Sequence, residues 1–288
     1  MVAVVGKPNV GKSTLLNRIV GTKLSIVSPK PQSTRNRVVG ILTESDSQII
    51  VLDTPGLLDP KYELQRAMRS TALEALKDAD VIVYLADATE GAAPTLAEAA
   101  GLSSAPRAPV IVAFNKADRL KAAQQEELRA AVPGALLVSA ANGDGVSDLL
   151  AEVRGHLPES PFLYPEDEIS TQHVRFFVAE LVRETALEQL SEELPYSIAC
   201  EVEEFREDRQ PLYIRAVLYV ERDSQKRILI GAKGQQIRTI GQTARVKIEA
   251  FVEQNVYLDL WVKVLPNWRK SATALARFGY RVQESSKK

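Results

Sequence analysis

The sequence predicts two domains of different fold class, an α/β domain followed by a smaller α+β domain. In the first half, short runs of Val, Ile and Leu alternate with helical patterns, which is typical of a mostly parallel sheet with helices on both faces. In the second half, the strands alternate polar and apolar residues, which indicates a sheet with one exposed face. A chain of 288 residues with 45% hydrophobic composition is long enough to bury two cores.

The first domain is predicted over residues 1–157. We expect its strands at VAVVG, QIIVLDT, DVIVYLADA, PVIVAFNKAD and ALLVSA. Helices are expected from about Ser13, near Glu63 to Lys77, near Ala122 to Ala131 and near Val146 to His156. Parallel sheets of this kind bind ligands in the loops at the carboxyl ends of their strands, so the loops after these strands are the place to look for a site.

A linker is predicted over residues 158–172, where LPESPFLYPEDE combines three prolines with four acidic residues. The second domain, residues 173–288, is expected to run helix, strand, strand, helix, helix, strand. Its strands are SIACEVEEF, PLYIRAVLYVE and VYLDLWVKVL, and one buried helical stripe comprises Ile237, Ile240, Ala244, Ile248 and Phe251.

Composition excludes several classes of protein. Cys200 is the only cysteine and His156 and His173 are the only histidines, so neither a disulfide framework nor a Cys/His zinc cage can form. No run approaches the roughly 18 apolar residues of a membrane span, which favours a cytoplasmic protein. The strand VAVV begins without lead-in residues, which favours a natural chain that extends slightly upstream.

The net charge of −1 hides an asymmetry along the chain. Residues 159–221 carry 5 basic and 15 acidic side chains, whereas residues 222–288 carry 14 basic and 5 acidic ones. A basic block on a folded domain indicates a polyanion-binding face, although an ordinary solvated surface is the alternative.

A phosphate-binding loop is predicted between the first strand and the first helix. The segment from Gly6 to Ser13 matches G-x-x-x-x-G-K-[ST]. Its backbone N–H groups would surround phosphates, Lys12 would supply a point charge and Ser13 a magnesium ligand. A glycine turn that happens to precede a helix is the alternative. The predicted nucleotide-binding residues here are Gly6, Lys7, Pro8, Asn9, Val10, Gly11, Lys12, Ser13 and Thr14.

A second motif, Asn115-Lys116-Ala117-Asp118, predicts guanine as the base. A carboxylate at Asp118 can accept two N–H donors from guanine, whereas adenine would leave it unmatched. Lys116 would lie over the base, and the backbone of Ser139, Ala140 and Ala141 would donate to the guanine carbonyl. A chance surface loop is the alternative, which the order of the motifs makes improbable.

Two further segments would sense the third phosphate. Asp53 ends an apolar strand and is predicted to hold magnesium through a water, while Gly56 would turn its N–H toward the γ-phosphate. Thr54, Pro55 and Leu57 complete this part of the predicted nucleotide site. The loop between Lys23 and Arg37 contains SPKPQSTRNR, where Thr34 would be a magnesium ligand and the loop would order with the γ-phosphate. A plain basic surface loop is the alternative.

The motifs GKPNVGKS, Thr34, DTPG, NKAD and SAA occur here in the order found in translation-factor-related GTPases. The resemblance covers residues 1 to about 157. It implies GTP and GDP as ligands, with Mg²⁺ held by Ser13, Thr34 and Asp53.

The loop Ile230-Gly231-Ala232-Lys233-Gly234 resembles the G-x-x-G loop of KH domains, which clamps about four nucleotides of single-stranded backbone. The predicted RNA-binding residues are these five and Arg238. The order of elements is that of the type II KH variety. A helix-turn-helix linker in a structural domain is the alternative.

One GTPase domain followed by one KH domain resembles the Era family of bacterial ribosome-assembly GTPases over nearly the whole chain. LPYSIACEVEEF, ILIGAKGQQIRTIG and PQSTRNR carry the resemblance, with Ser33 in place of a more usual threonine. It implies slow GTP hydrolysis, binding to the 3′ end of small-subunit (16S) ribosomal RNA and a role in 30S assembly. It also implies peripheral association with the inner face of the cell membrane, and we expect a monomer.

Hydrolysis lacks the expected water-orienting side chain, because Leu57 follows Gly56 where a polar residue is expected. Arg35 and Arg37 are candidate arginine fingers. The favoured candidate is Asn9, because an asparagine here in related GTPases helps to hold a potassium ion beside the phosphates. The predicted catalytic residues are therefore Asn9, Lys12, Thr34 and Gly56.

Two other functions fit parts of the pattern. One is a GTPase of RNA modification whose C-terminal domain docks a protein partner, which would show no affinity for single-stranded RNA. The other is a non-catalytic RNA-binding module with a vestigial nucleotide site, against which Lys12, Ser13, Asp53 and Asp118 argue.

Overall fold

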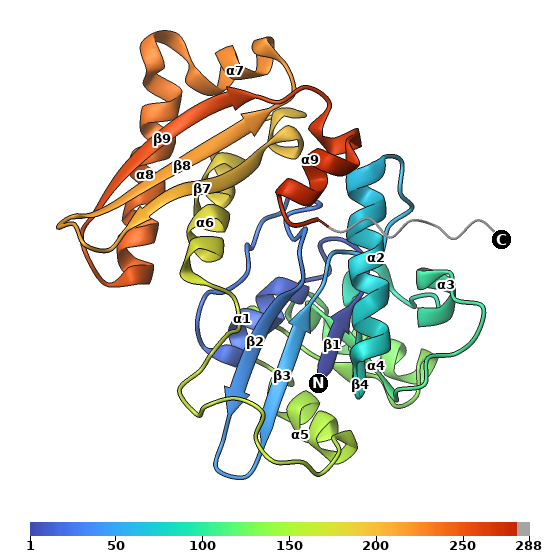
Figure 1. Ribbon diagram of the computed structural model, residues 1–288. Helices are drawn as coiled ribbons and strands as arrows, with labels where there is room; N and C mark the ends of the chain where they lie inside the picture. Colours follow the sequence, from blue (N-terminus) through green and yellow to red (C-terminus); the bar gives the residue numbers. More distant parts are fainter. Residues whose placement is uncertain (281–288) are drawn as a thin grey trace. The chain divides into compact units, whose positions relative to one another are not determined.

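The computed structural model describes residues 1–280, which form two compact units (Figure 1). The first unit comprises Met1–Lys61 and Gln65–Thr171, and the second comprises Tyr62–Leu64 and the chain from Gln172 onward. The end of the predicted second domain, residues 281–288, lies outside the described residues. The predicted boundaries of the linker stay predictions.

The first unit is built on a six-stranded sheet of order β2-β3-β1-β4-β5-β6. Its strands are β1 (Val2–Val5), β2 (Val38–Thr43), β3 (Gln48–Asp53), β4 (Val81–Asp87), β5 (Val110–Asn115) and β6 (Leu136–Leu137). All pairs are parallel except β2 with β3. Every residue of β1 and β4 is buried, which explains why these strands are continuous apolar runs.

Helices cover both faces of this sheet, as predicted. They are α1 (Lys12–Val20), α2 (Glu63–Asp78), α3 (Leu96–Ala100), α4 (Ala122–Ala131) and α5 (Val146–His156). Apolar residues of α2 and α3 share one core with β1 and β3, and Leu128 of α4 packs against Phe114. On the other face, α1 packs against β2 and β3, while α5 packs against β5.

The edge strand β2 and the short helix α3 were not predicted. β2 was missed because Gly40 interrupts its apolar run. A Cβ atom at Gly40 would lie 2.6 Å from side-chain atoms of both Leu16 and Val20 in α1. The glycine is therefore needed for close helix packing, and a pattern read along the strand does not reveal that need.

The predicted linker has no helix or strand, yet it is held against the first unit. The side chain of Gln48 accepts hydrogen bonds from the N–H groups of Leu163 (2.9 Å) and Tyr164 (3.0 Å). Farther along, the N–H of Ile41 donates to the carbonyl of Ile169 (2.9 Å). Since Ile41 lies on β2, this segment covers an edge of the sheet that would otherwise be open.

The second unit follows the predicted order and contains a three-stranded sheet, β7-β8-β9. Its elements are α6 (Val174–Gln189), β7 (Ala199–Arg206), β8 (Leu212–Val220), α7 (Asp223–Ile230), α8 (Gln235–Val252), β9 (Val256–Val264) and α9 (Ala272–Arg277). β7 and β8 are antiparallel, whereas β8 and β9 are parallel. In the predicted helical stripe, Ile240, Ala244 and Ile248 are fully buried, while Ile237 and Phe251 are partly buried. Helix α9 was not predicted.

Within residues 1–280, no helix combines the length and the apolar composition that crossing a membrane requires.

Candidate functional site

The phosphate-binding loop lies between β1 and α1, at the carboxyl end of the central strands (Figure 1). A Cβ atom at Gly6 would lie 2.1 Å from the Leu85 carbonyl oxygen, and one at Gly11 would lie 2.1 Å from Nδ2 of Asn115. Gly11 also has a φ of 98°, in the left-handed region. Side chains at either position would push the loop away from the sheet, so these glycines set its shape.

Lys12 bridges the phosphate-binding loop from within. Its Nζ donates to the carbonyl oxygens of Lys7 (2.8 Å) and Gly6 (3.2 Å). Burial lowers the pKa of Lys12 to about 8, and the nearby carboxylate of Asp53 opposes that shift only in part. Phosphate oxygens beside this buried group would favour its charged ammonium form, so the site suits a phosphate ligand.

Three oxygen-bearing side chains meet beside Lys12, from three different elements. The hydroxyl of Ser13 lies 2.8 Å from the Thr34 hydroxyl and donates to Oδ2 of Asp53 at 2.7 Å. The other oxygen of Asp53, Oδ1, is buried without a hydrogen-bond partner, and burial raises the pKa of this carboxyl. Hard oxygen donors with an unsatisfied carboxylate oxygen fit Mg²⁺, which prefers such ligands.

The base end of the site is held together by Asn115, at the end of β5. Its Nδ2 donates to the Val10 carbonyl (2.8 Å), and its Oδ1 accepts from the Ala140 N–H (2.8 Å). The side chain therefore joins the phosphate-binding loop to the loop after β6. Asp118, three residues later, is exposed at the pocket, where its carboxylate can accept hydrogen bonds from a ligand.

Lys116 has a partner that the sequence did not indicate. Its Nζ forms an ion pair with Asp87, at the end of β4, at 2.5 Å. Burial tends to raise the pKa of Asp87, but hydrogen bonds from Lys116 and Thr89 outweigh it and lower that pKa. The pair fixes the lysine at the edge of the base pocket.

Arg18, near the end of α1, is a second residue that sequence reasoning missed. Its guanidinium donates to the carbonyl oxygens of Ala140 (Nε, 3.2 Å) and Ala141 (Nη2). No local pattern signals such a contact, because its partners lie more than a hundred residues away.

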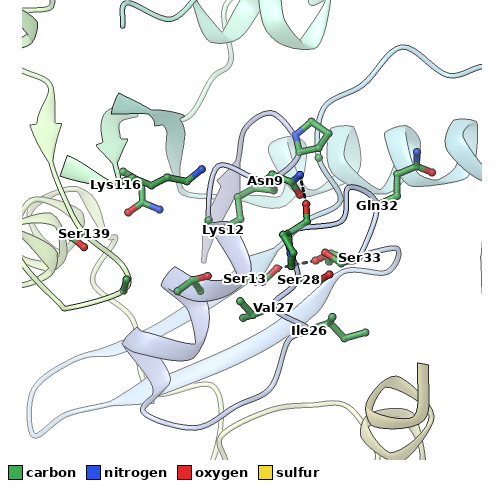
Figure 2. A pocket seen from close by; sticks show the side chains of 18 of the residues that line it. Asn9, Lys12, Ser13, Ile26, Val27, Ser28, Gln32, Ser33, Lys116 and Ser139 are labelled. Atoms are coloured by element: carbon green, nitrogen blue, oxygen red, sulfur yellow. Dashed lines mark hydrogen bonds between the residues drawn. The ribbon is translucent and has the colours of Figure 1, made fainter. Parts of the chain in front are cut away.

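These parts surround one pocket of about 450 Å³ (Figure 2). Of the predicted residues it is lined by Pro8, Asn9, Gly11, Lys12, Ser13, Thr14, Thr34, Gly56, Asn115, Lys116, Asp118, Ser139 and Ala141. It is also lined by Ile26, Val27, Ser28, Pro29, Gln32, Ser33 and Arg119, which were not predicted. Figure 2 shows Asn9 donating to the Pro29 carbonyl (2.9 Å), which ties the loop before β2 to the phosphate-binding loop.

The other predicted nucleotide-binding residues, Gly6, Lys7, Val10, Asp53, Thr54, Pro55, Leu57 and Ala140, do not line the pocket. Several of them form the hydrogen bonds described above and support the residues that line the pocket. Thr54 donates to the Val4 carbonyl (2.8 Å). Leu57 differs from this group. Its side chain is 5% exposed and belongs to the apolar core under the sheet, so the structure does not support a side-chain contact with a ligand.

The two candidate arginine fingers do not line the pocket either. Arg35 is 2% exposed, and Arg37 pairs with Asp78 of α2 (Nη1 to Oδ2, 2.8 Å). Their positions argue against a direct catalytic role.

The G-x-x-G loop of the second unit joins α7 to α8. Gly231 has a φ of 74°, and a Cβ atom there would lie 2.7 Å from the Cβ of Gln236. A Cβ atom at Gly234 would meet nothing within 4 Å, so this glycine faces open space. Gly234 also has a left-handed backbone, with a φ of 77°, so both glycines serve the turn, and the second leaves room for a ligand to approach the backbone as well.

A groove of about 460 Å³ begins at this loop and runs between α8 and β9. Its lining residues are Lys233, Gly234, Ile237, Arg238, Gly241, Gln242, Arg245, Val256, Tyr257, Leu258 and Leu260. Three of them are cations and none is acidic, which suits a polyanion. Of the predicted RNA-binding residues, Ile230, Gly231 and Ala232 do not line the groove. Ile230 packs against the core instead.

The fold and these two sites define a P-loop GTPase that carries a KH domain. Family models agree, since "50S ribosome-binding GTPase" matches residues 1–116 and "KH domain" matches residues 193–269. GTPase Era of Carboxydothermus hydrogenoformans is 43% identical over 97% of this chain and 96% of its own length. GTPase Era of Azotobacter vinelandii is 44% identical over 97% and 96%. The chain belongs to the Era family of GTPases.

Two solved structures are similar over nearly the whole chain. One is Era in complex with MgGDPNP and nucleotides 1506–1542 of 16S ribosomal RNA, with a TM-score of 0.90, 40% identity and 97% of each chain covered. The other is a variant of Aquifex aeolicus Era bound to GDP·AlF₄⁻, with the same TM-score and identity over 97% and 98% of the two chains. The predicted combination of a GTPase fold with a KH fold is thereby confirmed.

Proposed function

We propose that this protein is a GTP-dependent switch that binds the 3′ end of 16S ribosomal RNA and acts in assembly of the 30S subunit. The observation that carries the proposal is its similarity, over 97% of the chain, to an Era structure that holds both MgGDPNP and that RNA segment. The basic, acid-free groove beside the G-x-x-G loop supports it from this chain's own residues.

In the nucleotide pocket, we assign the phosphates to the loop from Gly6 to Ser13 and the base to Asp118. Lys12 would donate to phosphate oxygens, and Gly56 would turn its N–H toward the γ-phosphate. The loop after β6, held by Asn115 and Arg18, would donate to the guanine carbonyl.

Ser13, Thr34 and Asp53 would hold the magnesium ion, which neutralises charge on the phosphates when it is bound. Thr34 comes from the loop before β2, so its hydroxyl couples the position of that loop to the phosphate end of the pocket. Loss of the γ-phosphate would release the segment from Pro29 to Arg37, and this release is the proposed switch.

We propose that Asn9 supports hydrolysis by helping to hold a potassium ion. Asn9 is exposed at the rim of the pocket beside the Pro29 carbonyl, so carbonyl-type oxygens are available there for a cation. GTP turnover should be faster in potassium than in sodium at equal ionic strength, and Asn9→Ala should remove the difference. Equal rates in the two salts for the wild type would refute the role. Unchanged GDP affinity in Asn9→Ala would show that the pocket is intact.

The RNA assignment is tested at the G-x-x-G loop. Gly234→Asp adds a carboxylate where the structure leaves open space, so it should abolish binding of the 16S 3′-end RNA by charge repulsion. Because Gly234 has a φ of 77°, in the left-handed region, the variant should also lose a little stability. Gly231→Asp should do the same, with some loss of stability. GTP binding should be unchanged in both. RNA affinity equal to that of the wild type in Gly234→Asp would contradict the proposed function.

Two implications of the family resemblance also belong to the proposal, a monomeric state and peripheral association with the inner face of the cell membrane. Sedimentation of the full chain tests the first. Flotation with vesicles of anionic and neutral lipid tests the second.

A further inference from the structure

The backbone of Gln32, in the loop before β2, has a conformation that disfavours a side chain. Its φ is 63°, in the left-handed region, where a residue with a Cβ atom is strained and a glycine is not. Among residues 1–280, seven non-glycine residues have a positive φ, and three of them, Asn9, Gln32 and Lys116, line the nucleotide pocket. Strain of this kind collects at functional sites, and of these three residues Gln32 alone has no role so far.

The loop around Gln32 is held to the phosphate end of the pocket at two points. Nδ2 of Asn9 donates to the Pro29 carbonyl at 2.9 Å, and the Thr34 hydroxyl lies 2.8 Å from that of Ser13. One contact is three residues before Gln32 and the other is two residues after it. The Gln32 side chain is therefore kept beside the phosphate-binding loop, in the wall of the pocket (Figure 2).

We propose that Gln32 is the catalytic residue that orients the attacking water, which the side chain of Leu57 cannot do. The amide oxygen of Gln32 accepts a hydrogen bond from the water, and the amide nitrogen donates to an oxygen of the γ-phosphate. The water oxygen bonds to phosphorus while the bond from phosphorus to the bridging oxygen breaks, and GDP leaves with that electron pair. One proton stays on the attacking oxygen, and the other passes to another oxygen of the released phosphate.

An amide suits this role better than the other polar groups at the phosphate end. It carries its acceptor and its donor on separate atoms, so it can hold water and phosphate together, whereas a hydroxyl carries both on one oxygen. The hydroxyls of Ser13 and Thr34 lie against each other and are the proposed magnesium ligands, and Lys12 has no acceptor. The inference rests on the proposed position of the γ-phosphate beside Lys12, and it is independent of RNA binding.

The test compares GTP hydrolysis by the full-length variants Gln32→Ala and Gln32→Gly with that of the wild type. In both variants kcat should fall roughly a hundredfold, because the water is no longer oriented. KM and GDP affinity should stay within about twofold. Gln32→Gly suits the left-handed backbone, so it separates loss of the amide from a change in the loop. Gln32→Asn tolerates this backbone and keeps a shorter amide, so it should recover part of the activity.

A binding measurement gives a second readout that does not depend on turnover. GDP·AlF₄⁻ imitates the phosphate during transfer, so its affinity relative to that of GDP should fall in Gln32→Ala and Gln32→Gly. The matched control is Glu192→Gly, at an exposed residue of the second unit that also has a left-handed backbone, with a φ of 56°. This variant should leave kcat and both affinities unchanged.

Slow hydrolysis and weak GDP·AlF₄⁻ binding, with GDP affinity retained in both variants, support the catalytic role. Wild-type kcat in either Gln32→Ala or Gln32→Gly overturns it and leaves the proposed function intact. A loss of GDP affinity as large as the loss of kcat also overturns it, because the pocket as a whole would then be disturbed. Absence of GTP turnover in the wild type would overturn the proposed function and the catalytic role with it.

Discussion

Leu57 shows how a single side chain limits the chemistry of this GTPase. It follows Gly56, where a GTPase with a glutamine would orient the attacking water. Its N–H donates to the Gly6 carbonyl (2.9 Å), while its side chain is buried in the core with Val5 and Leu52. The aliphatic residue is therefore part of the fold, and it anchors the segment after β3 beneath the phosphate-binding loop.

Replacing Leu57 with glutamine should not create a faster enzyme. An amide in this apolar cluster loses the leucine contacts and leaves polar atoms unsatisfied, at a cost of about 3 kcal/mol in the free energy of unfolding. GTP turnover should not rise. Urea denaturation and turnover assays measure the two effects, with Leu58→Gln, at a half-buried neighbour, as the control. Faster hydrolysis with unchanged stability would contradict the buried role.

The lowered pKa of Lys12 predicts that nucleotide binding is linked to proton uptake. Its pKa of about 8 lies below the ordinary 10.5, so without ligand it is partly neutral above pH 8. Phosphate oxygens favour the ammonium form and raise that pKa again, so GDP binding should take up a fraction of a proton near pH 8, and affinity should fall as the pH rises further. Calorimetry in buffers of different ionisation enthalpy measures the uptake. At about pH 6 the uptake at Lys12 should vanish, since the group is already protonated.

The same shift affects stability with a definite sign. Between pH 8 and 10.5 the unfolded chain binds more protons at Lys12 than the folded chain does. This group alone therefore makes the ligand-free protein more stable as the pH rises through that interval.

At the scale of elements, α1 connects the two ends of the nucleotide pocket. Its first turn presents Lys12 and Ser13, and its last turn presents Arg18 to the loop after β6. One rigid helix thus fixes the distance between the phosphate-binding and base-binding groups. Asn115 makes a second connection from β5 between the same two loops.

Arg18→Ala should weaken guanine binding although Arg18 does not line the nucleotide pocket. The loop after β6 would lose two hydrogen bonds, so its contact with the guanine carbonyl would become less ordered, and GDP affinity should fall roughly tenfold. A 2-aminopurine nucleotide lacks that carbonyl, so its affinity should change less. Fluorescence titration compares the two ligands, and Arg129→Ala, exposed on α4, is the control. An equal loss for both ligands would indicate general destabilisation instead.

At the scale of the whole molecule, each unit has its own apolar core and its own candidate ligand. The core of the first unit packs the sheet against α2 and α3, and that of the second packs β7, β8 and β9 against α6 and α8. A ligand stabilises the unit that binds it, because only the folded form of that unit has the site.

Calorimetric unfolding should therefore show a transition for each unit. GDP with magnesium at about 100 times its dissociation constant should stabilise the first unit by about 2.7 kcal/mol. The 16S 3′-end RNA should raise the unfolding temperature of the second unit only. In Gly234→Asp the RNA effect should disappear and the GDP effect should remain. A shift of both transitions by GDP alone would show that the units unfold together.

The sequence alone predicted the order of most elements and the type of each site, but it missed β2, α3 and α9. Helices such as Ala122–Ala131 and Val146–His156 were predicted at their observed bounds because their patterns are local. The motif from Gly6 to Ser13 and the G-x-x-G loop are likewise short segments. The spacing of their glycines alone predicts a tight loop. Strand β2 escaped prediction because the role of Gly40 depends on α1, which packs across it.

Only the tertiary structure decided which residues support those sites. The burial of Leu57, the bonds from Arg18 to Ala140 and Ala141, and the ion pair of Lys116 with Asp87 join residues distant in sequence. The groove beside the G-x-x-G loop likewise depends on where β9 lies relative to α8. Such contacts have no local pattern, since they arise when separate elements pack, and that packing turns the motifs into sites.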